Sequence, residues 1–305
     1  MLEVNLHYPV YLVKLIRINE ISTSMQFPAR RAYHTIYDTS LAESIRYAAE
    51  NDWNGIVPDL SVPIFSPEKI TSRERTMLRE LSNEFSIEWG FHAPGDDVSL
   101  LSTYPSIRSG ILSYFKQIIN LARELSAGPT NMVIHAGIPP SFRKAGNQPV
   151  DGFSQQYQSV YAQVLRENLS DLLTHARPQV KLVIENVNWT PLVREVIEHL
   201  IPQGLKLCLD IPKLYGLDLK IREADWSLFQ RYKGSIEVVH IHDVIPQIGE
   251  HQVVGNGLID FQETLAFLSK LSAKPQYVFE VRPREEAHRS LANIGQIMKI
   301  FNYNL

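Results

Sequence analysis

The sequence has little of what marks secreted and membrane-embedded proteins. Its 305 residues contain a single cysteine, Cys208, so no disulfide can form within the chain. A lone cysteine inside an apolar segment is typical of a reducing compartment, and we therefore expect a cytoplasmic protein. The first segment is apolar but carries Glu3, Lys14 and Arg17, so we expect no secretory leader there. No segment approaches the ~18 uninterrupted apolar residues of a membrane-spanning helix, and we expect no membrane partner.

The chain also lacks the short motifs of several enzyme classes. Neither G-x-G-x-x-G nor G-x-x-x-x-G-K occurs, which counts against an open nucleotide-binding sheet. The G-x-S-x-G motif of serine hydrolases is absent too. Lysine and arginine number 30 and aspartate and glutamate 33, which gives a net charge of -3. Because nucleic-acid-binding proteins usually present an excess of positive charge, we expect no nucleic-acid partner.

What the sequence does contain is an alternation of short apolar segments with longer segments of helical apolar spacing. The first expected strand covers residues 32–37, and apolar residues at helical spacing follow it. Later helices are expected over 68–85, 105–126, 155–176, 222–232 and 260–272, from Pro191, and over 287–301. Eight strand–helix units predict one α/β domain, a (β/α)8 TIM barrel. We assign residues 31–305 to the barrel, residues 1–30 to an N-terminal extension or extra element, and segment 137–153 to a candidate lid.

Six of the apolar segments end in an acid or a histidine. They are EWGFH with His92, NMVIH with His135, KLVIE with Glu185, LKLCLD with Asp210, VVH with His240 and YVFE with Glu280. The carboxyl ends of barrel strands meet on one face, so these side chains are predicted to form one site. Buried imidazoles and carboxylates need partners, and a mixture of His, Asp and Glu is typical of a divalent metal site.

These segments resemble those of the xylose isomerase-like barrels, a superfamily of sugar isomerases and epimerases, inosose dehydratases and endonuclease IV. The resemblance covers about residues 32–300 and rests on FHAPG (91–95), VIHAG (133–137), VIEN (183–186), CLDIPKLYG (208–216), VHIHD (239–243), HQVVGNGLIDF (251–261) and FEV (279–281). It implies a shared set of metal ligands: Glu185, Asp210, His240 and Glu280. It further implies additional ligands or site histidines at His92, His135 and His251. One or two divalent ions, Mn²⁺ or Zn²⁺, suit such a set.

Two positions depart from the superfamily's pattern. The family often has D-x-x-H after the sixth strand, whereas Asp210 is followed by Lys213. The three-zinc endonucleases have an aspartate two residues before the position of His251, where this chain has Gly249. Two ligands for a third metal are therefore missing, which counts against a three-metal phosphodiesterase.

Four residues near the strand ends are candidates for substrate contact, namely Lys213, Arg282, Asn188 and Trp189. A cationic side chain can bind an anionic group, and an indole face suits the C–H face of a sugar. Structural alternatives remain open, since the lysine can be solvated, the arginine ion-paired and the tryptophan packed. His242 is expected to face the outer layer or the loop.

Together these features favour a metal-dependent isomerase or epimerase that acts on a sugar, sugar phosphate or keto-polyol by proton transfer next to a carbonyl. The family resemblance gives the acid–base roles to Glu185 and Glu280. A dehydratase of a keto-polyol begins with the same step and stays open. Two alternatives from other classes are an endonuclease IV-like phosphodiesterase on abasic DNA and a two-metal oxidative enzyme. The expected partner is a small carbohydrate, and a homo-oligomer stays open.

Overall fold

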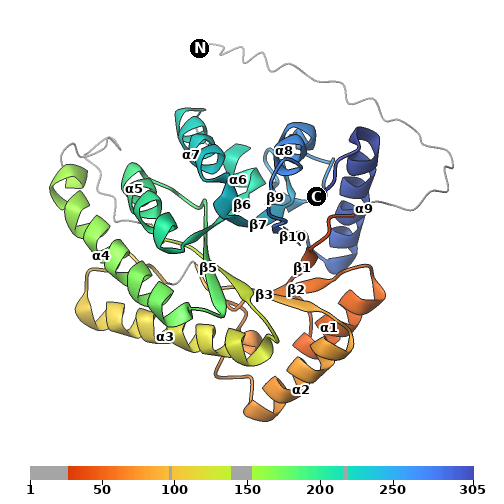
Figure 1. The fold of residues 1–305 in the computed structure, drawn as a ribbon, viewed down its shortest axis with the longest axis horizontal. Coiled ribbons are helices and arrows are strands. Elements are labelled where there is room, and N and C mark those ends of the chain that lie inside the picture. The colour runs from red at the N-terminus through yellow and green to blue at the C-terminus, as the bar shows by residue number, and fades with distance from the viewer. Residues whose placement is uncertain (1–26, 96–97, 139–152, 216–218) are drawn as a thin grey trace.

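Eight parallel strands close into a barrel in the computed structural model, which describes residues 27–95, 98–138, 153–215 and 219–305 (Figure 1). Around the barrel the strands follow the order β1-β10-β7-β6-β5-β4-β3-β2. Their bounds are Arg31–Thr35 (β1), Gly55–Pro58 (β2), Glu88–His92 (β3), Thr130–Ile134 (β4), Val180–Glu185 (β5), Lys206–Asp210 (β6), Ile236–Ile241 (β7) and Gln276–Phe279 (β10). The barrel predicted from the sequence is confirmed.

Helices surround the barrel on its outside (Figure 1). They are Leu41–Glu50 (α1), Ser72–Glu84 (α2), Pro105–Leu125 (α3), Phe153–Ala176 (α4), Pro191–Leu200 (α5), Ile211–Tyr215 (α6), Leu219–Arg231 (α7), Phe261–Leu268 (α8) and Arg284–Phe301 (α9), with short 3-10 turns at Pro63–Phe65, Ile201–Gln203 and Lys233–Ser235. Local sequence sets several starts: the Ser40 hydroxyl accepts the Glu43 N–H at α1, and Thr71 and Glu74 form a capping box at α2. Among the described helices, none combines the length and apolarity needed to cross a membrane.

The connection after β7 is more structured than its sequence pattern predicts. Strands Asp243–Ile245 (β8) and Gly249–Gln252 (β9) form an antiparallel hairpin there. The buried Asp243 carboxylate holds the following loop, because it accepts the backbone N–H groups of Gly255, Gly257 and Ile259. The hairpin carries His251 to the mouth of the barrel.

Two predicted segments, the extension at 1–30 and the candidate lid at 137–153, fall mostly outside the described residues.

Small side chains pack the inside of the barrel, one from each of seven strands. These are Ala32, Val57, Val133, Val183, Cys208, Val238 and Val278. The remaining strand, β3, has Gly90 here, where a Cβ would lie 2.6 Å from Gln276 Oε1 and 2.9 Å from Val57 Cγ2. Because side chains alternate along a strand, the residue two positions further on also faces inward, nearer the carboxyl end of the barrel. This layer is therefore the floor beneath the next set of inward side chains.

Candidate metal centre

At that next inward position every barrel strand supplies a polar side chain. In strand order along the chain they are His34, Asp59, His92, His135, Glu185, Asp210, His240 and Glu280. All of them except the fully buried His240 line one cavity of about 630 Å³. The six strand-end residues predicted from the sequence are thus gathered at one end of the barrel, together with two that were not predicted.

Glu185 lies at the centre of a group of histidines. Its Oε2 atom is 3.2 Å from His92 Nε2, 3.0 Å from His135 Nε2 and 3.6 Å from His240 Nδ1. Burial opposes ionisation of this carboxyl, but the neighbouring His240 and His135 hold its pKa well below the ordinary value. Glu185 is therefore an ionised carboxylate available for more than one partner.

Asp210 and Glu280 face the same region from the other side of His240. His240 Nδ1 is 3.3 Å from Glu280 Oε1 and 3.7 Å from Asp210 Oδ2. The buried Asn186 side chain fixes Asp210 by two hydrogen bonds, since its Nδ2 donates to the Asp210 carbonyl at 3.0 Å and its Oδ1 accepts the Asp210 N–H at 2.7 Å. Burial again opposes ionisation, yet His242 and His240 lower the pKa of Asp210.

Electrostatics in this layer favour positive charge. Burial opposes protonation of His92, but hydrogen bonding and charge attraction from Glu185 raise its pKa to about 9. Burial also opposes protonation of His240 and His242, while carboxylates raise the pKa of both, chiefly Glu280 for His240 and Asp210 for His242. A divalent cation would meet the same demand for positive charge, since a metal ion binds an imidazole in its neutral form.

The donor atoms fit a divalent metal ion. Both ring nitrogens of His240 and the Oε1 atom of Glu280 are buried and have no hydrogen-bond partner among the described residues. Buried polar atoms without a partner are costly, and a metal ion would satisfy Glu280 Oε1 and one of the two His240 nitrogens. Ligand atoms of Asp210, His240 and Glu280 lie within 4.8 Å of one another. Carboxylate oxygens with one imidazole suit Mn²⁺ and also accept Zn²⁺.

His251 lies at the edge of this group. Its Nδ1 donates to the Glu280 carbonyl at 2.9 Å, and its backbone N–H donates to His242 Nδ1 at 3.0 Å. Burial and the neighbouring His242 lower the pKa of His251 to about 3. The neutral ring that results leaves Nε2 as a free acceptor beside the cavity that His251 lines.

The expectation that His242 faces the outer layer was wrong. Its side chain is fully buried, and its Nε2 lies 3.4 Å from Asp210 Oδ2 and 3.8 Å from Glu280 Oε2. His242 lies two residues after His240, and side chains two positions apart in an extended segment face the same side, so the alternation itself brings both inward.

The four substrate-contact candidates have different positions. Lys213 and Arg282 line the cavity, and the Lys213 ammonium donates to Glu250 while its backbone N–H donates to Asp210 Oδ1 at 3.0 Å. Asn188 is exposed and is not among the described residues that line the cavity. The expectation for Trp189 is corrected, because its ring is 3% exposed and stacks on Phe229 with centroids 5.4 Å apart.

His34 and Asp59 were missed in the sequence, although the rule that found the other six also applies to Asp59. Asp59 directly follows β2, as Glu280 follows β10. His34 is the penultimate residue of β1, and the longer strand expected at 32–37 placed it in mid-strand. A search for polar residues two positions beyond small interior residues finds both.

Comparison with known proteins agrees with this fold. Residues 45–296 match the family model of the xylose isomerase-like TIM barrel, and the chain belongs to this family. An uncharacterized protein of Methanocaldococcus jannaschii is 22% identical over 228 residues, which cover 72% of this chain and 81% of that protein.

Two solved structures, one of an epimerase-like protein and one of a sugar epimerase, are similar to the whole barrel. A D-tagatose 3-epimerase-like protein has a TM-score of 0.69 at 19% identity and covers 90% of this chain and 98% of its own. The 3-keto-D-glucoside 4-epimerase of E. coli has a TM-score of 0.66 at 13% identity, and the match covers 88% of this chain and 99% of the epimerase chain. At such identities the similarity shows the fold, and the chemistry has to be argued from the site.

Proposed function

We propose that this protein is a metal-dependent isomerase or epimerase of a sugar, sugar phosphate or keto-polyol. The observation that carries the proposal is the pair of carboxylates Glu185 and Glu280, which approach His240 Nδ1 to 3.6 Å and 3.3 Å from two different strands. The epimerases among the similar structures support the same reaction class. A cavity of about 630 Å³ matches the size range of small-molecule sites.

The reaction needs a base, an acid and a stabiliser of negative charge. A divalent ion held by Glu185, Asp210, His240 and Glu280 would supply the electrophile for charge that develops on substrate oxygen. Glu185 or Glu280 removes the proton from the carbon next to the carbonyl, and the other returns it. Return to the opposite face of that carbon gives an epimer, and return to the neighbouring carbon gives an isomer.

Two cationic side chains on the cavity wall, Lys213 and Arg282, are the candidates for substrate binding. Arg282 lines the cavity, and its Nε atom is buried without a hydrogen-bond partner among the described residues. Lys213 lies on the cavity wall and is paired with Glu250. Burial opposes its charge, but Asp210 and Glu250 raise the pKa of Lys213, so its ammonium is protonated at neutral pH. We expect Arg282 to bind a hydroxyl, carboxylate or phosphate oxygen of the substrate.

The Lys213 ammonium also argues against the endonuclease alternative. It occupies the chain position where the superfamily's third metal has a histidine ligand, and a fixed positive charge repels a cation. Efficient metal-dependent cutting of an abasic-site duplex would contradict the proposed function directly.

The test is substrate-dependent washout of deuterium from a panel of ketoses, ketose phosphates and keto-inositols in the presence of Mn²⁺. Glu185→Gln and Glu280→Gln keep the side-chain size and one oxygen but remove the base, so we expect a loss of about 10²–10⁴-fold. Glu195→Gln is the matched control, because the Glu195 side chain is 72% exposed on α5. It should leave the rate unchanged.

Metal content measured on each variant separates loss of the base from loss of the ion. Washout that survives unchanged in both site variants would exclude these residues as the acid–base pair. Absence of washout with every carbonyl substrate would favour the hydrolytic or oxidative alternative.

A further inference from the structure

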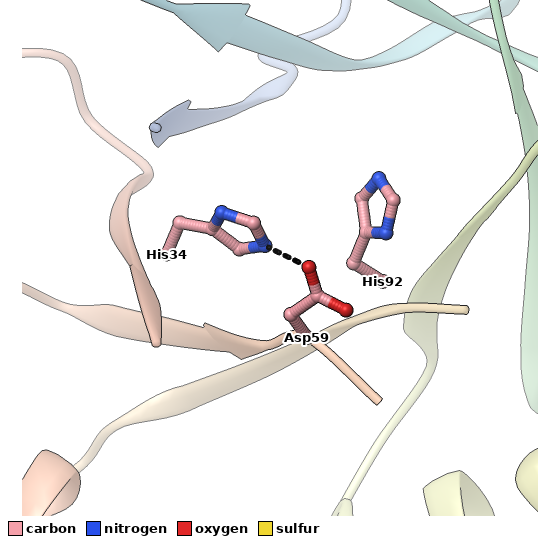
Figure 2. Close-up of side chains that lie close together, drawn as sticks. All are labelled: His34, Asp59 and His92. Carbon is pink, nitrogen blue, oxygen red and sulfur yellow. Dashed lines mark ion pairs between the residues drawn. The ribbon is translucent and has the colours of Figure 1, made fainter. Parts of the chain in front are cut away.

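His34, Asp59 and His92 form a second group of potential ligands on the β1–β3 side of the barrel mouth. Their ligand atoms all lie within 4.8 Å of one another. Figure 2 shows the Asp59 carboxylate between the two imidazole rings, with the marked contact running to His34. None of the three is among the residues that hold the ion proposed above.

His34 has no hydrogen bond for either ring nitrogen in the described part of the chain, although its side chain is only 2% exposed. Its Nε2 is 3.6 Å from Asp59 Oδ2, and its Nδ1 is 3.6 Å from Glu280 Oε1. A donor–acceptor separation of about 3.6 Å is too long for a hydrogen bond. Two ligands that bind one ion at about 2.0–2.2 Å stand roughly 3–3.5 Å apart, so the separation is close to that of two metal ligands.

Asp59 is already held in position for such a role. Its backbone N–H donates to the Thr35 carbonyl at 3.1 Å, and the next residue, Leu60, donates to the His92 carbonyl at 2.9 Å. The Ser61 N–H donates to Asp59 Oδ1 at 2.9 Å, which leaves Oδ2 directed to His34. Hydrogen bonds of this kind fix the orientation of a ligating carboxylate.

Charge balance also leaves room for a second cation. Four carboxylates line the cavity, those of Asp59, Glu185, Asp210 and Glu280. One divalent ion balances two of them. Asp59 follows β2, which is two places in the barrel order from the strand before Glu280 and three places from the strand of Glu185. Arg282 on the cavity wall offsets part of the remaining negative charge, and a second cation beside Asp59 would offset the rest.

We propose that His34, Asp59 and His92 bind a second divalent cation, separate from the ion held by Glu185, Asp210, His240 and Glu280. Two imidazole nitrogens and one carboxylate oxygen suit a borderline ion such as Zn²⁺ or Fe²⁺ better than Mg²⁺ or Ca²⁺. His92 is the ligand nearest to the first ion, because its Nε2 is also 3.2 Å from Glu185 Oε2. The inference concerns metal binding and holds whichever reaction the protein catalyses.

The test is the number of Zn²⁺ ions per chain, measured by elemental analysis after removal of unbound metal. We expect two ions in the wild type and one in His34→Gln and in Asp59→Asn. Asp52→Asn is the matched control, because Asp52 is exposed and Asn also tolerates its positive φ of 61°. It should keep both ions. Asp210→Asn should instead lose the ion held by Glu185, Asp210, His240 and Glu280. The two sites are therefore tested separately.

A zinc-soaked crystal of the wild type answers the question even if a variant does not fold. We expect an anomalous peak at about 2.0–2.2 Å from ligand atoms of His34, Asp59 and His92. One ion per wild-type chain, or two ions retained in Asp59→Asn, would overturn the proposal. A second peak bound instead by His92, His135 and Glu185 would do the same.

Discussion

Gly95 offers a way to disturb the metal centre without changing any ligand. A Cβ at this position would overlap His135 Nδ1 and lie 2.6 Å from His135 Cε1, whereas ordinary contacts begin at 3.4 Å. Gly95 is not among the glycines with positive φ, so alanine suits its backbone. In Gly95→Ala the His135 ring must therefore move by more than an ångström, which breaks its 3.0 Å contact with Glu185 Oε2.

The expected loss can be bounded. Disturbing the groups that orient metal ligands typically costs about 10–100-fold in metal affinity. We expect a loss of that size in Gly95→Ala, measured by competition with a chelator at neutral pH. His135→Ala should show a similar loss, and the double variant should lose little more, because both changes remove the same contact.

Gly110→Ala is the control for this experiment. A Cβ at Gly110 meets nothing within 4 Å, and the residue lies in α3. The change should leave metal affinity unaltered and stabilise the helix by about 0.5–1 kcal/mol. If folded Gly95→Ala protein binds metal as tightly as the wild type, His135 does not orient Glu185 for metal binding.

Asn186→Ala should lower the free energy of unfolding, measured in urea, by about 2–5 kcal/mol, because it leaves the buried N–H and carbonyl of Asp210 without their partners. The control, Asn83→Ala at an exposed position, should stay within about 0.5 kcal/mol of the wild type. An equal effect of the two substitutions would contradict the role given to Asn186. Cys208 should not react with thiol reagents in the native protein at mildly alkaline pH, because burial raises its pKa well above the ordinary value and keeps it a thiol. It should react fully after unfolding in urea, and rapid reaction of the native protein would show that the barrel floor is open.

The fold could be predicted from the sequence because each barrel strand is a short apolar run followed by a helix with one apolar face. The parallel strands are buried on both faces, so each can be recognised in the sequence as a continuous apolar segment that does not alternate with polar residues. The β8–β9 hairpin and the loop after it could not be predicted, since the Asp243 carboxylate that holds this loop binds backbone groups up to sixteen positions further along the chain. Such long-range capping leaves no periodic signal.

The site could be predicted only where a strand end was placed correctly. Glu185 and Asp210 end their strands, so their inward direction follows from the alternation of side chains. His34 was missed because the expected first strand ran two residues beyond Thr35. Trp189 was misjudged because the direction of a side chain in a turn depends on packing, here against Phe229, and not on periodicity.

The most direct test of the proposed metal centre is anomalous diffraction from a crystal grown with Mn²⁺ and measured at the manganese edge. We predict a peak at about 2.0–2.3 Å from ligand atoms of Glu185, Asp210, His240 and Glu280. The same peak should vanish in Asp210→Ala. A crystal loaded with manganese whose peaks all lie away from these four residues would contradict the metal centre and the reaction proposed for it.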